Sequence, residues 1–150
     1  MESVKISEKQ LYSIISESIV KILREERSEN IDNDIIELIS YLHNMQKPLR
    51  EIHWNTNEYS THMVTDETID DVIEWEDTLA EAFVSNTNIE LTISDVKPSS
   101  DYKTLMEELI NKASTIKDNI SDNKEYDSIC AVLDEIIEKS NQLLYKSQLK

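Results

Sequence analysis

The chain has 150 residues, with 15 Lys and Arg against 31 Asp and Glu, and a formal net charge of −16 at pH 7. This length suits one domain with a sizeable core. The sequence contains no glycine, which excludes the glycine-rich phosphate loops of P-loop and dinucleotide-binding proteins. Because nucleic acid is a polyanion, the negative charge argues against DNA binding and favours cations or basic proteins as partners.

Cysteine usage and hydropathy indicate the compartment. Cys130 is the only cysteine, so no disulfide can form within the chain, and a reducing cytoplasm fits best. A membrane-spanning helix needs about 18 consecutive apolar residues, and the sequence has no such run. We therefore expect a cytoplasmic protein with no membrane partner.

The N-terminal segment is predicted to be a separate helix. Ser7 and Gln10 have the spacing of a capping box, and the Asn- and Asp-rich stretch 28–33 is the first expected break. Between them runs an apolar stripe with helical spacing: Leu11, Ile15, Ile19 or Val20, Ile22 and Leu23. We call residues 1–27 the leader and expect it to be an attachment helix, a domain distinct from residues 28–150. Its stripe is expected to pack on a groove of the same subunit, on a neighbouring subunit or on a foreign protein partner.

Four further helices are expected in residues 28–150. The first is predicted to kink at Pro48 and to end near Trp54, and the next to run from about Glu58 to Phe83. A long polar connection comes next, with a short extended piece at most in 89–96, and Ser99 or Ser100 caps the next helix. A turn at 121–123 leads to the last helix. Because a long middle connection lets two consecutive helices lie parallel, the prediction is an all-α, ferritin-like four-helix bundle.

An acidic stretch in the middle of this bundle contains the candidate chemistry. From Glu51 to Val96 the sequence has twelve Asp and Glu, no Lys or Arg, and the histidines His53 and His62. Like charges three and four residues apart destabilise a helix. Such a face is therefore either solvated or neutralised by a bound cation.

Spacing favours a cation shared between two chains. His62, Asp66, Asp77 and Glu81 are separated by 4, 11 and 4 residues and fall within about 100° of one another on a helix. The His62–Asp66 and Asp77–Glu81 pairs are nevertheless about 22 Å apart along the axis, so one ion cannot touch both pairs of one chain. Two antiparallel copies related by a two-fold axis bring the pairs together and form two equivalent sites. Nitrogen and oxygen ligands together suit ferrous iron or zinc.

The order His53-Trp54-Asn55, His62, Asp66, Asp77 and Glu81 resembles the ferroxidase signature of the Dps family, the mini-ferritins. The resemblance implies that these two histidines and three carboxylates are both the metal ligands and the catalytic residues. It also implies iron sites between subunits, peroxide-dependent oxidation and storage of iron, and a hollow shell of twelve subunits. The spacing from His53 to His62 is shorter than is usual in the family, and Ala82 stands where arginine is common. The short spacing and the leader resemble phage-encoded proteins, which would place the chain in a virion.

Alternative sites and functions involve the same residues. A self-contained di-iron bundle needs Glu three residues before its histidines, and Ser40, Arg50 and Tyr59 occupy those positions. His43 is expected to be a boundary residue, and both tryptophans are expected to pack. The main alternative function is a non-enzymatic scaffold or virion assembly protein, in which the metal motif is degenerate and the leader is the docking element.

Overall fold

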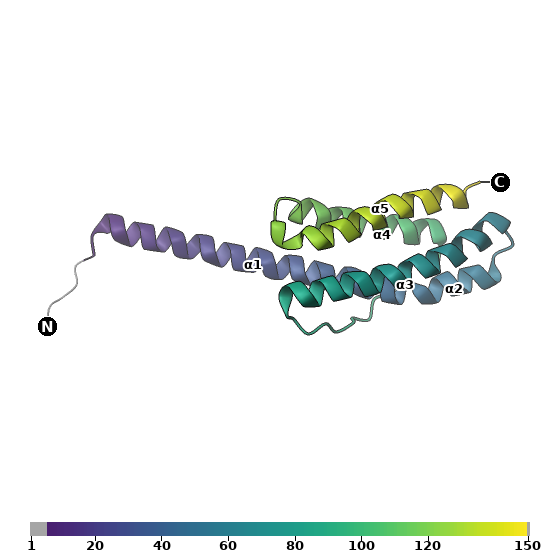
Figure 1. Ribbon diagram of the computed structural model, residues 1–150, viewed down its shortest axis with the longest axis horizontal. Coiled ribbons are helices and arrows are strands. Elements are labelled where there is room, and N and C mark those ends of the chain that lie inside the picture. Colours follow the sequence, from purple (N-terminus) through teal and green to yellow (C-terminus); the bar gives the residue numbers. More distant parts are fainter. Residues whose placement is uncertain (1–5, 150) are drawn as a thin grey trace. The chain divides into compact units, whose positions relative to one another are not determined.

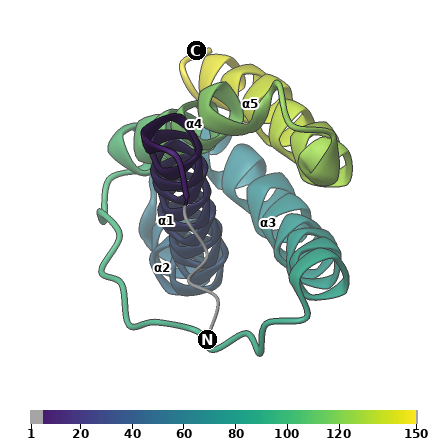
Figure 2. The same cartoon turned by 90° about the vertical axis from the view of Figure 1, so that its left-hand side faces the viewer.

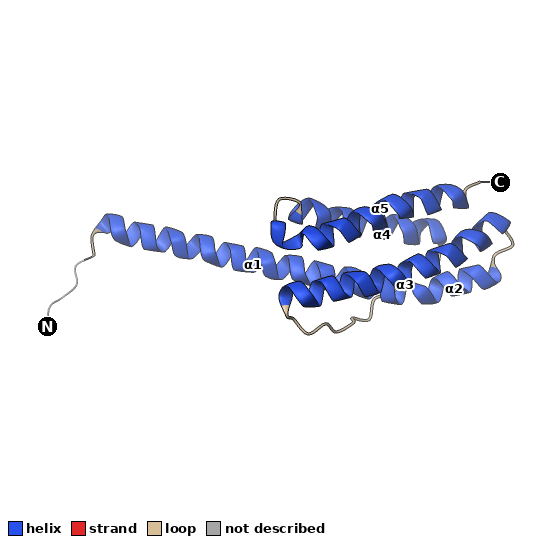
Figure 3. Ribbon diagram, in the orientation of Figure 1, coloured by secondary structure: helices blue, strands red, loops and turns tan. Residues whose placement is uncertain are grey.

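The computed structural model describes residues 6–149, which contain helices and connections but no strand. The helices are α1 (Glu8–Asn44), α2 (Gln46–Asn55), α3 (Tyr59–Thr87), α4 (Tyr102–Ile120), the short 3-10 helix η1 (Lys124–Tyr126) and α5 (Asp127–Ser147), drawn in Figure 3. The predicted all-α class is confirmed. None of the helices in this part of the chain is long and apolar enough to cross a bilayer.

The chain divides into two compact units, Met1–Asn33 and Asp34–Lys150. In the first unit the predicted capping box is confirmed: the Ser7 N–H donates to Gln10 Oε1 at 3.0 Å, and the Gln10 N–H donates to Ser7 Oγ at 3.1 Å. The first five residues of the leader lie outside the described residues.

The predicted break at 28–33 is wrong, because α1 continues through it. Ser, Asn and Asp each lower helix propensity by less than about 0.7 kcal/mol. The stretch holds neither proline nor glycine, so its polar residues weaken the helix without ending it.

The second unit begins with the last part of α1, and the helix is interrupted close to Pro48, where a kink is predicted. Only Met45 separates α1 from α2, and Pro48 is the third residue of α2. A proline cannot donate to the carbonyl four residues before it, and its ring clashes with that carbonyl. Helical backbone hydrogen bonds are present before and after Pro48: the Met45 N–H donates to Tyr41 O at 2.9 Å, and the Leu49 N–H donates to Met45 O at 3.1 Å.

Helix α3 starts where the sequence predicts but ends four residues later, at Thr87 instead of Phe83. The last turn is helped by the Thr87 hydroxyl, which donates to Phe83 O at 2.8 Å. Asn88 then stops the helix in the left-handed conformation, with φ of 56°. Asparagine adopts this region more readily than most residues, so it serves here in a chain without glycine.

The connection 88–101 forms no strand and is attached to α1 by side chains. The Ser94 N–H donates to Ser40 Oγ at 2.9 Å, and Asn44 Nδ2 donates to Ser94 O at the same distance. Helix α4 is capped by Asp101, whose side chain accepts from the Thr104 N–H at 3.0 Å. The prediction of Ser99 or Ser100 is therefore wrong. Ser99 Oγ instead accepts from the Asp101 N–H at 3.1 Å and shapes the preceding turn.

Four helical arms make the bundle: the end of α1 with α2, then α3, α4 and α5. Helix α3 packs against α2 and α5, and α4 packs against α5. Figure 1 shows α3 and α4 running in the same direction, and Figure 2 shows the connection between them curving around the outside of the bundle. One long crossover therefore joins two parallel helices of the bundle. The core is built from leucine, isoleucine and large aromatic side chains of all four arms.

Candidate metal centre

The short turn between α2 and α3 brings two of the predicted ligands together. Helix α2 ends at Asn55 and α3 begins at Tyr59, so only residues 56–58 connect two packed helices. His53 lies in the last turn of α2 and His62 in the first turn of α3. Their rings stack, with centroids 4.0 Å apart and an angle of 17° between the planes.

Reciprocal hydrogen bonds hold the two rings in place. His53 Nδ1 lies 2.9 Å from His62 O, and His62 Nδ1 lies 2.9 Å from His53 O. Thr65 Oγ1, 3.1 Å from His53 Nδ1, completes the contact. We call His53, His62 and Thr65 the histidine clasp. The sequence motif did not include Thr65, although its position three residues after His62 puts it on the adjacent turn of α3.

The partners of the histidine clasp determine where the imidazole hydrogens are. A carbonyl oxygen only accepts hydrogen bonds, so both Nδ1 atoms carry the hydrogen. In a neutral ring the lone pair is then on Nε2. Metal-binding histidines have the same arrangement, because the ligating ring commonly donates its other N–H to a carbonyl or carboxylate.

The stacked arrangement also limits what the clasp can hold. Each Nε2 lone pair lies in the plane of its ring, and the two planes are nearly parallel. Zinc and similar ions bind histidine nitrogen at about 2.0–2.1 Å. Two lone pairs that lie in nearly parallel planes, in rings whose centroids are 4.0 Å apart, cannot meet at one ion at that distance. One ion therefore receives one imidazole from the clasp unless a ring turns.

The three predicted carboxylates lie on the solvent face of α3. Asp66, Asp77 and Glu81 are all exposed, while the opposite face of α3 is buried and includes Val72 and Leu79. The helix is continuous from His62 to Glu81, so the separation of about 22 Å between the two pairs stands. Among residues 6–149 no group of three or more His, Cys, Asp or Glu side chains could hold an ion. The structure thus brings together His53 and His62 but not the whole predicted set.

Other acidic residues of α3 face α5, and the sequence did not single them out. Lys139 hydrogen-bonds Glu67 at 2.6 Å and thereby lowers the pKa of that carboxyl. Burial raises the pKa of Asp71, Lys139 opposes this, and the charges of neighbouring acids, including Glu67, add to the rise. Asp71 Oδ2 is buried with no hydrogen-bond partner. Helical position could have distinguished these residues, because they lie on the flank of α3 that meets α5.

A buried hydroxyl pair lies deeper between α3 and α4. The Thr68 hydroxyl is 2.5 Å from Val64 O and donates to it. Since its only hydrogen is used there, Tyr102 donates to Thr68 Oγ1 across 2.8 Å. Burial raises the pKa of Tyr102 to about 12.

His43, expected to be a boundary residue, is exposed and bound to α3. His43 Nδ1 lies 2.6 Å from Glu76 Oε1, and Gln46 Nε2 donates to Glu76 Oε2 at 2.5 Å. The two tryptophans differ. Trp75 is buried, as predicted, whereas Trp54 is 70% exposed, so the prediction that both pack within the chain is wrong for Trp54.

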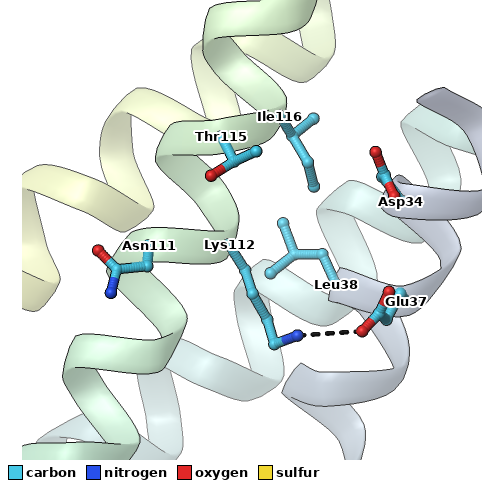
Figure 4. A pocket seen from close by; sticks show the side chains of 7 residues that line it. All are labelled: Asp34, Glu37, Leu38, Asn111, Lys112, Thr115 and Ile116. Atoms are coloured by element: carbon cyan, nitrogen blue, oxygen red, sulfur yellow. Dashed lines mark hydrogen bonds and ion pairs between the residues drawn. The ribbon is translucent and has the colours of Figure 1, made fainter.

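A separate groove of about 230 Å³ lies between α1 and α4 in the second unit (Figure 4). Lys112 crosses it to bind Glu37 at 3.0 Å and lies over the Tyr41 ring, 5.4 Å from its centroid. It contains none of the predicted ligands. Its lining residues are Asp34, Glu37, Leu38, Asn111, Lys112, Thr115 and Ile116.

Comparison with known proteins gives one match. Residues 53–147 match DUF5856, a family of unknown function. The matched range begins at His53 and contains all five predicted ligands, and it leaves out the leader. No curated protein and no solved structure matches the chain.

Proposed function

Because the chain belongs to DUF5856, a family of unknown function, we propose its function from its own residues: it binds and oxidises ferrous iron. The proposed site combines His53, His62 and Asp66 of one copy with Asp77 and Glu81 of a partner subunit. Nitrogen and oxygen donors in one site suit a borderline divalent ion. Zinc would bind the same donors without being oxidised.

The observation that carries the proposal is the hydrogen bonding of the histidine clasp. Both Nδ1 atoms are bound to backbone carbonyls at 2.9 Å, so both Nε2 atoms keep their lone pairs in the neutral rings. The ring nitrogens therefore have the tautomer that metal binding requires before any metal arrives. His62 and Asp66 are one turn apart on α3, so an imidazole and a carboxylate are available on adjacent turns.

A second copy is needed because one chain supplies too few ligands. The stacked rings present at most one imidazole to an ion, and Asp77 and Glu81 are about 22 Å along the helix from His62 and Asp66. An antiparallel second α3 places its Asp77 level with Asp66 and its Glu81 level with His62, because the residue numbers of each pair add to the same value. A homodimer is the smallest assembly that completes the site. The resemblance to mini-ferritins extends this to a twelve-subunit shell.

The proposed reaction balances with peroxide as the oxidant. Two ferrous ions give up one electron each, and these two electrons with two protons reduce one hydrogen peroxide to two water molecules. The carboxylates of α3 supply negative charge, which stabilises the ferric product more than the ferrous substrate because the product carries the higher charge.

An anaerobic titration with ferrous iron tests the proposal. We expect two ions per chain, one for each imidazole of the clasp, and then a ferric absorbance when peroxide is added. The double variant that carries both Asp77→Asn and Glu81→Gln should lose peroxide-driven iron oxidation and keep the helical circular dichroism of the wild type. Unchanged oxidation in this double variant would refute the site.

Matched controls are available on the same helices. The double variant Asp70→Asn and Glu74→Gln also removes two negative charges from α3, at positions outside the proposed ligand set. It should still oxidise ferrous iron. His43→Gln removes a histidine whose Nδ1 faces a carboxylate instead of a backbone carbonyl, and it should leave the iron titration unchanged. A strictly monomeric chain at micromolar concentration with iron present would refute the shared site.

The second candidate is a helical scaffold, within a virion or elsewhere, that uses no metal. The same clasp favours it, because stacking and the two reciprocal bonds by themselves join the end of α2 to the start of α3. Under this alternative His53→Gln lowers the stability of the bundle, while iron and zinc neither bind nor raise the midpoint of thermal unfolding. Under the metal proposal a bound ion raises that midpoint.

A further inference from the structure

The leader carries a set of apolar side chains that its own unit does not cover. Eight large apolar residues between positions 11 and 23 are exposed, from 47% for Val20 to 76% for Tyr12. By contrast, the apolar residues of the bundle core are fully or almost fully buried. All eight lie in the unit Met1–Asn33, and burying such side chains is the main drive for association.

The apolar positions of residues 11–23 in the leader form a palindrome centred on Glu17. Within this range each apolar residue on one side has an apolar counterpart at the same distance on the other side, and the polar positions match in the same way. The apolar pairs are Leu11 with Leu23, Tyr12 with Ile22, Ile14 with Val20, and Ile15 with Ile19. Turning the helix end over end therefore reproduces the same pattern of apolar and polar positions.

This symmetry is what a contact between two identical chains requires. In a two-fold interface the same surface is used by both subunits, so it must be complementary to itself. We propose that the leader packs antiparallel against the leader of a second copy, with the two-fold axis level with Glu17. The occupant of the apolar stripe is then a second copy of this chain.

The acidic residues of the leader are compatible with this arrangement. The two copies of Glu17 come level with each other, but at 100° per residue Glu17 lies about 180° from the middle of the stripe, so the two carboxylates point away from the contact. Glu8 and Glu26 lie in line with the stripe, one beyond each end, and Glu8 comes level with the partner's Glu26. Both are exposed, so their repulsion is weak and screened by salt, and they limit the apolar contact to residues 11–23.

The proposal is independent of the metal site, because it uses neither α3 nor a cation. Sedimentation of the full chain with a metal chelator measures it. We expect a monomer–dimer equilibrium that Ile15→Glu shifts to the monomer, with the dissociation constant raised at least about 100-fold because both chains of the pair lose a buried isoleucine. Ser13→Glu adds the same charge on the polar side of the same helix and should leave the equilibrium unchanged.

Cysteine crosslinking determines the orientation. With Cys130→Ser as background, Tyr12→Cys and Leu23→Cys should crosslink when the two variants are mixed, and neither should crosslink alone. In the antiparallel pair two Tyr12 positions are about 15 Å apart along the axis, whereas in a parallel pair they are level with each other. Crosslinking of Tyr12→Cys with itself would overturn the antiparallel arrangement.

Three further outcomes decide whether the leader contact exists. A full chain that stays monomeric in chelator at micromolar concentration overturns it, and so does a dimer that Ile15→Glu leaves intact. A dimer that survives chelator and the Asp77→Asn with Glu81→Gln change, but not Ile15→Glu, supports the leader contact even if the iron titration fails.

Discussion

The leader and the bundle contain similar apolar stripes, but the stripe of the leader is exposed and the stripes of the bundle are buried. Leu11, Ile15 and Ile22 of the leader are about half exposed, whereas Leu38 and Leu42, farther along the same helix α1, are completely buried. The difference lies in the connections between helices. Within the bundle, short connections bring α3 back onto α2 and α5 back onto α4, and each returning helix covers its neighbour. A stripe predicts that a helix needs a partner, and the connections decide whether the chain itself supplies one.

The largest expected effect is on the free energy of unfolding, which should depend on a buried stripe of the bundle and not on the leader stripe. Leu109→Ala, in the buried face of α4, should lower the free energy of unfolding of the bundle by about 3 kcal/mol, through lost apolar contact and the cavity left behind. Ile15→Ala in the leader should change it by less than about 0.5 kcal/mol. Urea denaturation monitored by tryptophan fluorescence measures both. Equal losses would show that the leader belongs to the core.

The second effect tests the buried hydroxyl pair between α3 and α4. Thr68→Val should cost about 1–3 kcal/mol, because it leaves the Tyr102 hydroxyl buried without its acceptor. Denaturation of the double variant Thr68→Val with Tyr102→Phe should recover much of this loss, since no orphaned polar group remains. A double variant that loses the sum of both single changes would contradict the hydrogen bond between the two hydroxyls.

The third effect is a stabilisation. Burial raises the pKa of Asp71, so the folded state holds its proton more tightly than the unfolded state. Its contribution to stability therefore falls as the pH rises through the window between the usual and the raised pKa. Asp71→Ala should accordingly raise the midpoint of thermal unfolding at pH 7, because it removes a carboxylate oxygen that is buried without a hydrogen-bond partner.

The gain from Asp71→Ala should shrink as the pH falls below the usual carboxyl range, where the wild-type side chain is protonated in both states. Asp70→Ala is the matched control, because Asp70 is exposed on the same helix. A gain of the same size in both variants would point to helix propensity instead of the buried carboxyl.

The fourth expected effect is a small change in helicity and thermal stability. Deleting residues 1–27 should leave the helicity and the thermal unfolding of the remainder nearly unchanged, because the capping box and the stripe of the leader lie in the separate unit Met1–Asn33. The same deletion should abolish association in chelator. Failure of the truncated chain to fold would mean that the bundle depends on the leader.

The smallest expected effect is the absence of DNA binding by either region. Residues 1–33 carry five Lys and Arg against seven Asp and Glu, and residues 34–150 carry ten against 24. Neither region offers the several phosphate contacts that binding needs. A gel-shift assay at about 150 mM salt should show no complex, and a clear shift would contradict this.

Local rules predicted much of the secondary structure. The capping box at Ser7 and the end of α2 at Asn55 each depend on one or two neighbouring residues, and each is found as predicted. The errors arose where a polar composition was taken as a helix end. The mostly polar stretches 28–33 and 85–87 are helical, because without proline or glycine the backbone hydrogen bonds outweigh the small propensity losses.

For the candidate site, spacing along α3 was predictable and contact across helices was not. The face that carries His62, Asp66, Asp77 and Glu81 is set by 3.6 residues per turn. The reciprocal bonds of the histidine clasp depend on how the turn 56–58 sets α2 against α3, which no periodicity encodes. The same is true of Thr65, which enters the clasp only through that packing.

The sequence by itself determined the all-helical class, the positions of most helix starts, the acidic character of the bundle and the line of ligand-type residues on α3. These depend on periods, caps and charges that act within a few residues. Only the tertiary structure decided that the leader stripe is left exposed by its own unit, whereas Leu38 and Leu42 of the same helix are buried. It also decided that the two histidines stack instead of converging. Both outcomes depend on contacts between segments, which are set by connection lengths and side-chain packing together.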